Sequence, residues 1–108
     1  MPIDFANVFN TLKNGVVDLA KKDLNNYLDA ATKDGQAMLE SLKNNLYTWT
    51  LELNNGSLTA DGFADLVAGQ KDVLELAALK DAGLAAVAAD QFKSDLLNLV
   101  TNTITGLL

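Results

Sequence analysis

The 108-residue sequence contains neither cysteine nor histidine. Without cysteine, the chain has no disulfide, no thiolate nucleophile and no thiolate ligand for a metal. Without histidine, it lacks the most common general base and the most common metal ligand, which excludes Ser-His and Cys-His catalytic pairs. We therefore expect a protein that is not an enzyme and that holds no cofactor.

Arginine is absent as well, and 8 lysines face 14 acidic residues, which gives a formal net charge of −6. Bidentate contacts to phosphate and guanine rely mainly on arginine, and a negative surface repels the nucleic-acid backbone. The composition therefore predicts no nucleic-acid partner. It also disfavours binding to anionic membrane surfaces, and the sequence has no uncharged run long enough for a transmembrane segment.

The N-terminal stretch MPIDFANVFNTLK carries an acid at Asp4 and lacks the basic region followed by an apolar run that marks a signal peptide. We therefore expect a cytoplasmic protein. The lack of cysteine does not test this expectation, because a cysteine-free chain folds equally well in the cytosol and in the periplasm.

Proline occurs once, at Pro2, and aromatic residues make up only 6% of the chain, whereas alanine and leucine dominate its 49% apolar content. Alanine and leucine have the highest helix propensities, and no proline interrupts a helix after residue 2. The sequence predicts an all-α fold in one domain, residues 1–108, built as an antiparallel four-helix bundle. Its turns are expected at residues 32–35, 54–57 and 80–83, with caps from Asp4 and from Ser57 or Thr59.

A second architecture remains open, because the apolar positions continue in tolerable phase across Gly35 and Gly83. In this alternative, residues 4–53 and 59–106 form two long helices folded as one hairpin. Such a hairpin could not bury its wide apolar faces alone and would have to dimerise into a bundle. The sequence does not decide whether residues 32–35 and 80–83 are turns or lie inside helices.

Residues 73–100 are the longest apolar-dominated stretch, and residues 84–89 within it are apolar in every direction of a helix. A helix that is apolar all round belongs inside a protein. We therefore expect residues 84–89 to be shielded on all sides by the other helices.

Further apolar positions widen the predicted helix faces beyond what one core needs, and surplus apolar stripes often form an interface. These positions are Ile3, Val17, Leu24, Leu28, Leu76, Leu79, Leu97 and Ile104. The first hypothesis for function is thus a non-enzymatic interaction or scaffold protein that associates with a second copy of itself, as a dimer, through these faces.

A second hypothesis is a carrier or sensor of a small apolar ligand, because the small residues at 82–89 leave space between helices and bundle interiors often bind ligands. The candidate pocket residues are Trp49, Leu84, Ala85, Ala88 and Phe92. A third hypothesis is the coating of a lipid or polymer surface by the amphipathic helices.

Three acids, Asp23, Asp81 and Asp95, project into apolar faces of their predicted helices. Carboxylate-bridged metal sites in bundles combine Glu with Glu-x-x-His on facing helices, and this chain has no histidine. We therefore predict no metal site. Asp81 is expected to cap the last helix, and Asp23 and Asp95 to lie at the margins of their faces.

Overall fold

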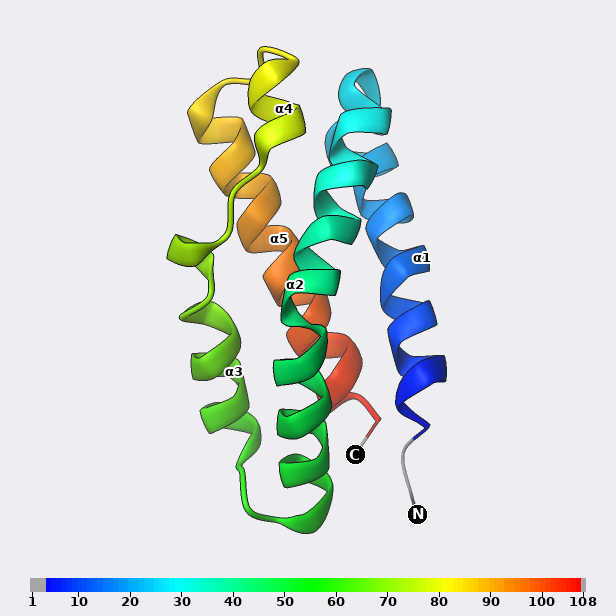
Figure 1. The fold of residues 1–108 in the computed structure, drawn as a ribbon, viewed down its shortest axis with the longest axis vertical. Helices are drawn as coiled ribbons and strands as arrows, with labels where there is room; N and C mark the ends of the chain where they lie inside the picture. Colours follow the sequence, from blue (N-terminus) through cyan, green and yellow to red (C-terminus); the bar gives the residue numbers. More distant parts are fainter. Residues whose placement is uncertain (1–3, 108) are drawn as a thin grey trace.

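The computed structural model describes residues 4–107, and all regular structure in this range is helical (Figure 1). Five α-helices follow one another along the chain, with a short 3₁₀ turn after the first (η1) and another after the third (η2). They are α1 (Phe5–Asp23), η1 (Asn25–Tyr27), α2 (Leu28–Asn55), α3 (Ala60–Ala68), η2 (Lys71–Val73), α4 (Ala77–Asp81) and α5 (Ala86–Thr105). The predicted all-α class is confirmed.

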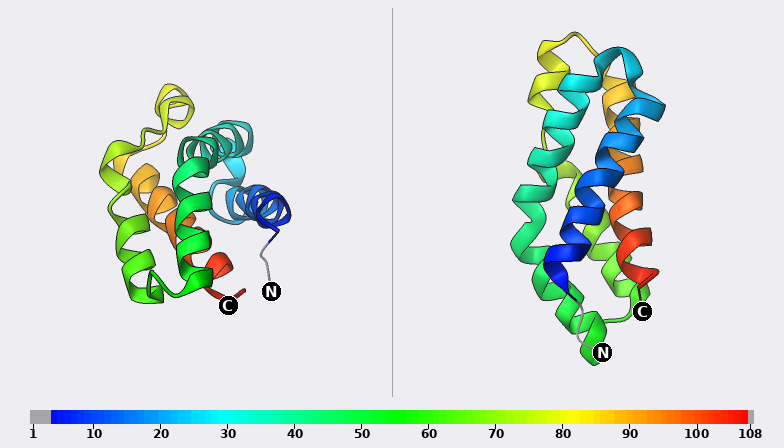
Figure 2. Two further views of the ribbon diagram at one scale, coloured as in Figure 1. Left: turned by 60° about the horizontal axis from the view of Figure 1, so that its bottom comes forward. Right: turned by 90° about the vertical axis from the view of Figure 1, so that its right-hand side faces the viewer.

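The helices form an elongated molecule of 43 × 24 × 19 Å (Figures 1 and 2). α1 and α2 run antiparallel, the chain then returns through α3 and α4, and α5 runs back beside them (Figure 1). A four-helix bundle is not confirmed. In place of a single third helix, the chain forms two short helices, α3 and α4, joined by residues 69–76. The two-helix hairpin is wrong, since the chain leaves the helical conformation after α1, after α3 and after α4.

α1 begins as predicted, with the Asp4 carboxylate accepting a hydrogen bond from the backbone N–H of Asn7 at 3.3 Å. It ends at Asp23, well before the predicted stop, because Leu24 leaves the helical conformation with φ −136° and ψ 49°. Asparagine is a weak helix former that favours turns, so two asparagines after Leu24 favour the break seen there. The hairpin between α1 and α2 therefore lies at residues 24–27.

The predicted turn at residues 32–35 is wrong, because α2 runs through it without interruption. Gly35 is buried, and a Cβ atom added there would lie 2.4 Å from Cγ1 of Val16 and 3.0 Å from Cδ1 of Leu96. The missing side chain thus allows α1 and α5 to approach α2 closely. Gly35 serves helix packing and not helix termination.

The other two predicted turns are present. α2 ends at Asn55 with Gly56 in the left-handed conformation, and the Thr59 hydroxyl caps α3 by accepting from the backbone N–H of Gly62 at 3.0 Å. Gly83, at φ +90°, forms a turn with Ala82, whereas Lys80 and Asp81 still lie in α4, so this turn occupies the second half of the predicted range. Glycine adopts a positive φ readily because it has no Cβ atom, which explains its presence at both positions.

The core lies between α1, α2, α3 and α5, with Leu79 added from α4. Its largest fully buried side chains are Phe63, Phe92, Leu12, Met38, Leu39, Leu42, Leu46, Leu79, Leu96, Ile104, Val16 and Val67. No helix in the described range is both long enough and apolar enough to cross a bilayer.

The expectation that residues 84–89 are buried on all sides is wrong. Val87 is 83% exposed, Ala85 and Ala86 are exposed, and Leu84 is only half-buried. These residues form the turn and the first helical turn at one end of the molecule (Figure 1), and only Leu84 and Ala89 among them pack partly against the core. The buried part of α5 begins further along, at Phe92.

Candidate functional site

A cleft of about 600 Å³ opens between the link that precedes α4, α4 itself and the first half of α5. Its volume falls within the range of small-molecule sites. The residues that line it are Leu74, Glu75, Leu76, Ala77, Lys80, Asp81, Leu84, Ala86, Ala89, Asp90 and Lys93.

The cleft exists because the link of residues 69–76 separates α3 from α4. α3 ends at Ala68, and Leu74 adopts an extended conformation, φ −98° and ψ 139°, in the link that follows. Leu74 and Leu76 turn their side chains inward, each 8% exposed, while Glu75 between them is exposed. On the opposite wall, Ala86 and Ala89 of α5 have small side chains that leave the space between the two walls unfilled.

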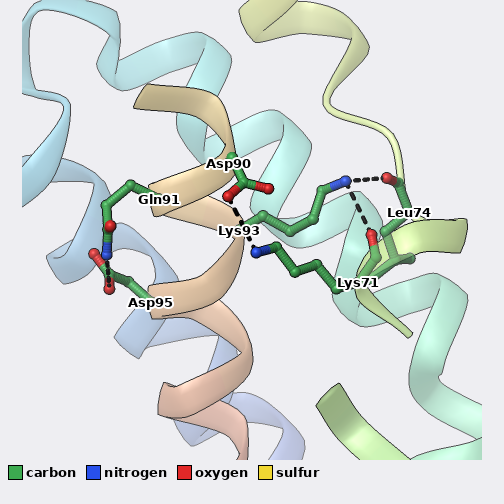
Figure 3. Close-up of polar contacts among 6 residues, drawn as sticks. All are labelled: Lys71, Leu74, Asp90, Gln91, Lys93 and Asp95. Atoms are coloured by element: carbon green, nitrogen blue, oxygen red, sulfur yellow. Dashed lines mark hydrogen bonds and ion pairs between the residues drawn. The ribbon is translucent and has the colours of Figure 1, made fainter. Parts of the chain in front are cut away.

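Two lysines attach the link to α5 (Figure 3). The Lys93 ammonium donates hydrogen bonds to the backbone carbonyls of Leu74 and Lys71, the latter at 3.0 Å. Lys71 in turn forms an ion pair with Asp90 at 3.1 Å. Lys93 and Asp90 thus hold one wall of the cleft in place.

The remaining charged residues of the cleft are Glu75, Lys80 and Asp81, all exposed at its rim. Within residues 4–107, none of the three forms an ion pair at 4.0 Å or less. An apolar floor below a solvated, charged rim is typical of sites for apolar molecules, because the floor supplies the contact area and the rim stays in water.

α4 forms the second wall, and a residue distant in sequence holds it. The Asp34 carboxylate accepts a hydrogen bond from the backbone N–H of Ala78 at 3.0 Å and another from that of Leu79 at 2.7 Å. Asp34 lies in α2, is only 6% exposed, and was expected from the sequence to be part of a turn. It acts as an N-cap for α4, supplied by a neighbouring helix.

Of the five predicted pocket residues, only Leu84 lines the cleft. Trp49 is half-buried on α2, where its ring packs against Phe63 at 6.3 Å between ring centroids. Phe92 is buried in the core, Ala85 is exposed and Ala88 is half-buried. The structure therefore does not bring these five residues together.

Sequence reasoning missed the link and its leucines. The available signals were Gly69 directly after α3 and the alternation Leu74-Glu75-Leu76, which is the spacing of an extended segment with one buried side. Because a continuous helix was expected from residue 59 to the turn at residues 80–83, neither Gly69 nor the alternation at Leu74-Glu75-Leu76 was interpreted as the start of an extended link.

The side chains predicted to form a surplus interface are mostly in the core. Leu24, Leu76, Leu79, Leu97 and Ile104 are buried within the single chain. Val17 and Leu28 are half-buried, and Ile3 lies outside the described residues. The seven that the structure describes therefore do not form a free apolar face in the folded chain.

Two of the three acids singled out from the sequence meet. A hydrogen bond to the Asp95 carboxyl, partial burial and the negative charge of Asp95 raise the pKa of Asp23 above 3.8, while Lys22 opposes the shift. Asp95 also accepts a hydrogen bond from the Gln91 side-chain amide at 2.8 Å (Figure 3).

Asp81 does not join that pair and lines the cleft instead. It also does not cap α5, whose N-cap residue is Ala85 without a side-chain hydrogen bond. Across residues 4–107, no three acidic side chains gather closely enough to hold a metal ion.

Comparisons of the chain with protein-family models, with curated proteins and with solved structures found no significant match.

Proposed function

We propose that the chain binds a small apolar ligand reversibly in the cleft between the link, α4 and α5, as a carrier or sensor and not as an enzyme. The observation that carries this proposal is a space of about 600 Å³ floored by leucine and alanine side chains from three segments of the chain. Burial of apolar ligand surface on such a floor contributes roughly 25 cal/mol per Å².

The surroundings of the cleft support binding more than catalysis. The chain offers neither a histidine nor a cysteine to activate a substrate, and the carboxylates at the rim are exposed. A general acid or base needs a pKa near the working pH, which usually requires burial or a charged partner. The charged rim is better suited to keeping the mouth of the cleft hydrated.

The test is a fluorescence titration with dansyl-undecanoate, an acyl chain carrying a dansyl group, against the wild-type chain and Ala86→Phe. Ala86 is exposed and lines the cleft, so a phenyl group there fills the space without disturbing the core. We expect the wild-type chain to enhance the probe's emission with an affinity near the micromolar range, about −8 kcal/mol, and Ala86→Phe to bind about tenfold more weakly.

Ala85→Phe is the matched control, because Ala85 is the exposed neighbour of Ala86 and does not line the cleft. It is expected to bind the probe like the wild type. Absence of any emission change with the wild-type chain overturns the proposal, and equal loss in both variants shows that the probe binds elsewhere.

A second candidate function is self-association as a dimer through residues 82–88, a surface that differs from the interface predicted from the sequence. Residues 82–88 carry no charge, and five of them, Ala82, Gly83, Ala85, Ala86 and Val87, are exposed at one end of the molecule. Contiguous exposed apolar surface is a common mark of an interaction site. Sedimentation of the wild-type chain and of Val87→Lys tests this candidate.

Coating of a lipid or polymer surface by amphipathic helices is less well supported. The apolar faces of α1, α2 and α5 that would contact such a surface form the core of the single chain. Coating would therefore require the helices to separate first.

A further inference from the structure

α4 is too short to be stable by itself. It has only five residues, and its N-cap residue Leu76 provides no side-chain hydrogen bond. Gly83, with a positive φ, lies two residues beyond its end and prevents the helix from continuing. Isolated helices shorter than about 12 residues are marginal in water, because the first turn costs more conformational entropy than its hydrogen bonds return. The order of α4 must therefore come from its tertiary contacts.

Two features anchor α4, which packs mainly against α2. The Leu79 side chain is completely buried, and the Asp34 carboxylate accepts from the backbone N–H groups of Ala78 and Leu79 at 3.0 and 2.7 Å. The first amides of a helix have no partner within the helix. A buried carboxylate that accepts from two of them forms charge-assisted hydrogen bonds, which are roughly twice as strong as neutral ones.

The two walls of the cleft are thus held mainly by different contacts. α4 supplies Ala77, Lys80 and Asp81 to the cleft and packs mainly against α2. The link is held on α5 by the hydrogen bonds of Lys93 and by the ion pair of Lys71 with Asp90. Release of α4 from Asp34 would remove one wall while the other stayed in place.

We propose that Asp34 controls the cleft as a positioning residue: docking of α4 on its carboxylate completes the ligand site, and a bound ligand holds α4 docked. This inference rests on the proposed function. It makes the ligand affinity depend on the fraction of molecules in which α4 is docked. By thermodynamic reciprocity, ligand binding must then increase the docked fraction.

Asp34→Asn tests the inference, since asparagine keeps the shape of the side chain but presents an amide N–H₂ to one of the two backbone N–H groups. We expect amide exchange at Ala78 and Leu79 to accelerate about tenfold while amides in the middle of α1 exchange as before. We also expect dansyl-undecanoate to bind about tenfold more weakly than to the wild type. Asp29→Asn is the matched control, because it makes the same change at an exposed position of α2.

A second measurement needs no variant, which matters if Asp34→Asn fails to fold. Saturating dansyl-undecanoate should slow amide exchange at Ala78 and Leu79 of the wild-type chain by more than it slows exchange in α1. Equal slowing of amide exchange in α4 and α1 would overturn the proposed role of Asp34, because it would report only a global stabilisation of the fold by the ligand.

The failures of the two proposals are distinguishable. If the wild type binds the probe and Asp34→Asn binds it equally well, the control by Asp34 is wrong and the proposed function stands. If the wild type binds no probe, the proposed function is wrong and the control by Asp34 falls with it.

Discussion

Thr50 is almost completely buried in α2, at 2% exposure, and its hydroxyl oxygen has no hydrogen-bond partner among residues 4–107. A buried hydroxyl without a partner costs about 1–3 kcal/mol of stability. Thr50→Val keeps the branched shape and removes the polar atom, so we expect the free energy of unfolding to rise by about 1 kcal/mol. Urea unfolding of the variant measures this change.

The control for that experiment is Thr48→Val, the same substitution at an exposed position of the same helix. It should change the free energy of unfolding by less than about 0.5 kcal/mol. A loss of stability in Thr50→Val would mean that the hydroxyl forms a hydrogen bond in solution.

The pair formed by Asp23 and Asp95 has a pH dependence whose sign follows from the raised pKa of Asp23. Because the folded chain binds this proton more tightly than the unfolded chain, its stabilising contribution is complete below pH 3.8 and is lost as the pH rises through the folded pKa. The negative charge of Asp95 disfavours the ionised form of Asp23, which is one cause of the raised pKa.

Asp95→Asn should therefore return the pKa of Asp23 toward its ordinary value, because an amide N–H can donate to the Asp23 carboxylate and one negative charge is removed. NMR titration of the Asp23 carboxyl carbon checks this. Stability at pH 7 should rise by no more than about 0.5 kcal/mol, since the site is largely exposed. Asp18→Asn, at an exposed position of α1, should leave the pKa of Asp23 where it is in the wild type.

At the scale of elements, the contact of α2 with α1 and α5 depends on the absence of a side chain at Gly35. A Cβ atom there would lie 2.4 Å from Cγ1 of Val16, so either the Val16 side chain or one of the helices must shift. We expect Gly35→Ala to lower the free energy of unfolding by about 1–3 kcal/mol, although alanine by itself favours the helix by about 1 kcal/mol. Chemical denaturation measures the net change.

Two further variants separate packing from helix propensity. Gly15→Ala meets only the flexible end of Leu99, at 3.0 Å, and should be close to neutral. Val16→Ala should rescue part of the loss when it is combined with Gly35→Ala, because it removes the atom that clashes. No rescue would mean that Gly35 acts through the α2 backbone and not through packing.

At the scale of the whole molecule, the net charge of −6 opposes the approach of two copies. If residues 82–88 form a dimer contact, the dimer fraction should rise between about 0.02 M and about 0.5 M NaCl, because salt screens the repulsion and leaves apolar association intact. Analytical ultracentrifugation at both salt concentrations measures this. Val87→Lys should lower the dimer fraction, and a chain that remains monomeric at both salt concentrations excludes the contact.

The sequence by itself determined the helical class, the cap at Asp4, the turn at residues 54–57 and a following cap at Ser57 or Thr59, of which the structure shows Thr59. These features are local, because each depends on residues within one or two helical turns of one another. Propensity, capping chemistry and the conformational freedom of glycine are therefore sufficient to predict them.

Only the tertiary structure decided the role of Gly35, the partner of Asp34, the exposure of residues 84–89 and the position of the cleft. Gly35 and Asp34 form their contacts with residues that are distant in sequence, so neither their spacing nor their periodicity distinguishes a packing glycine from a turn. An apolar helical stretch shows which side chains avoid water, but not whether a neighbour is there to cover them. Whether a neighbour covers them depends on where α4 docks. The Asp34 carboxylate, 44 residues before Ala78 in the chain, holds α4 in its docked position.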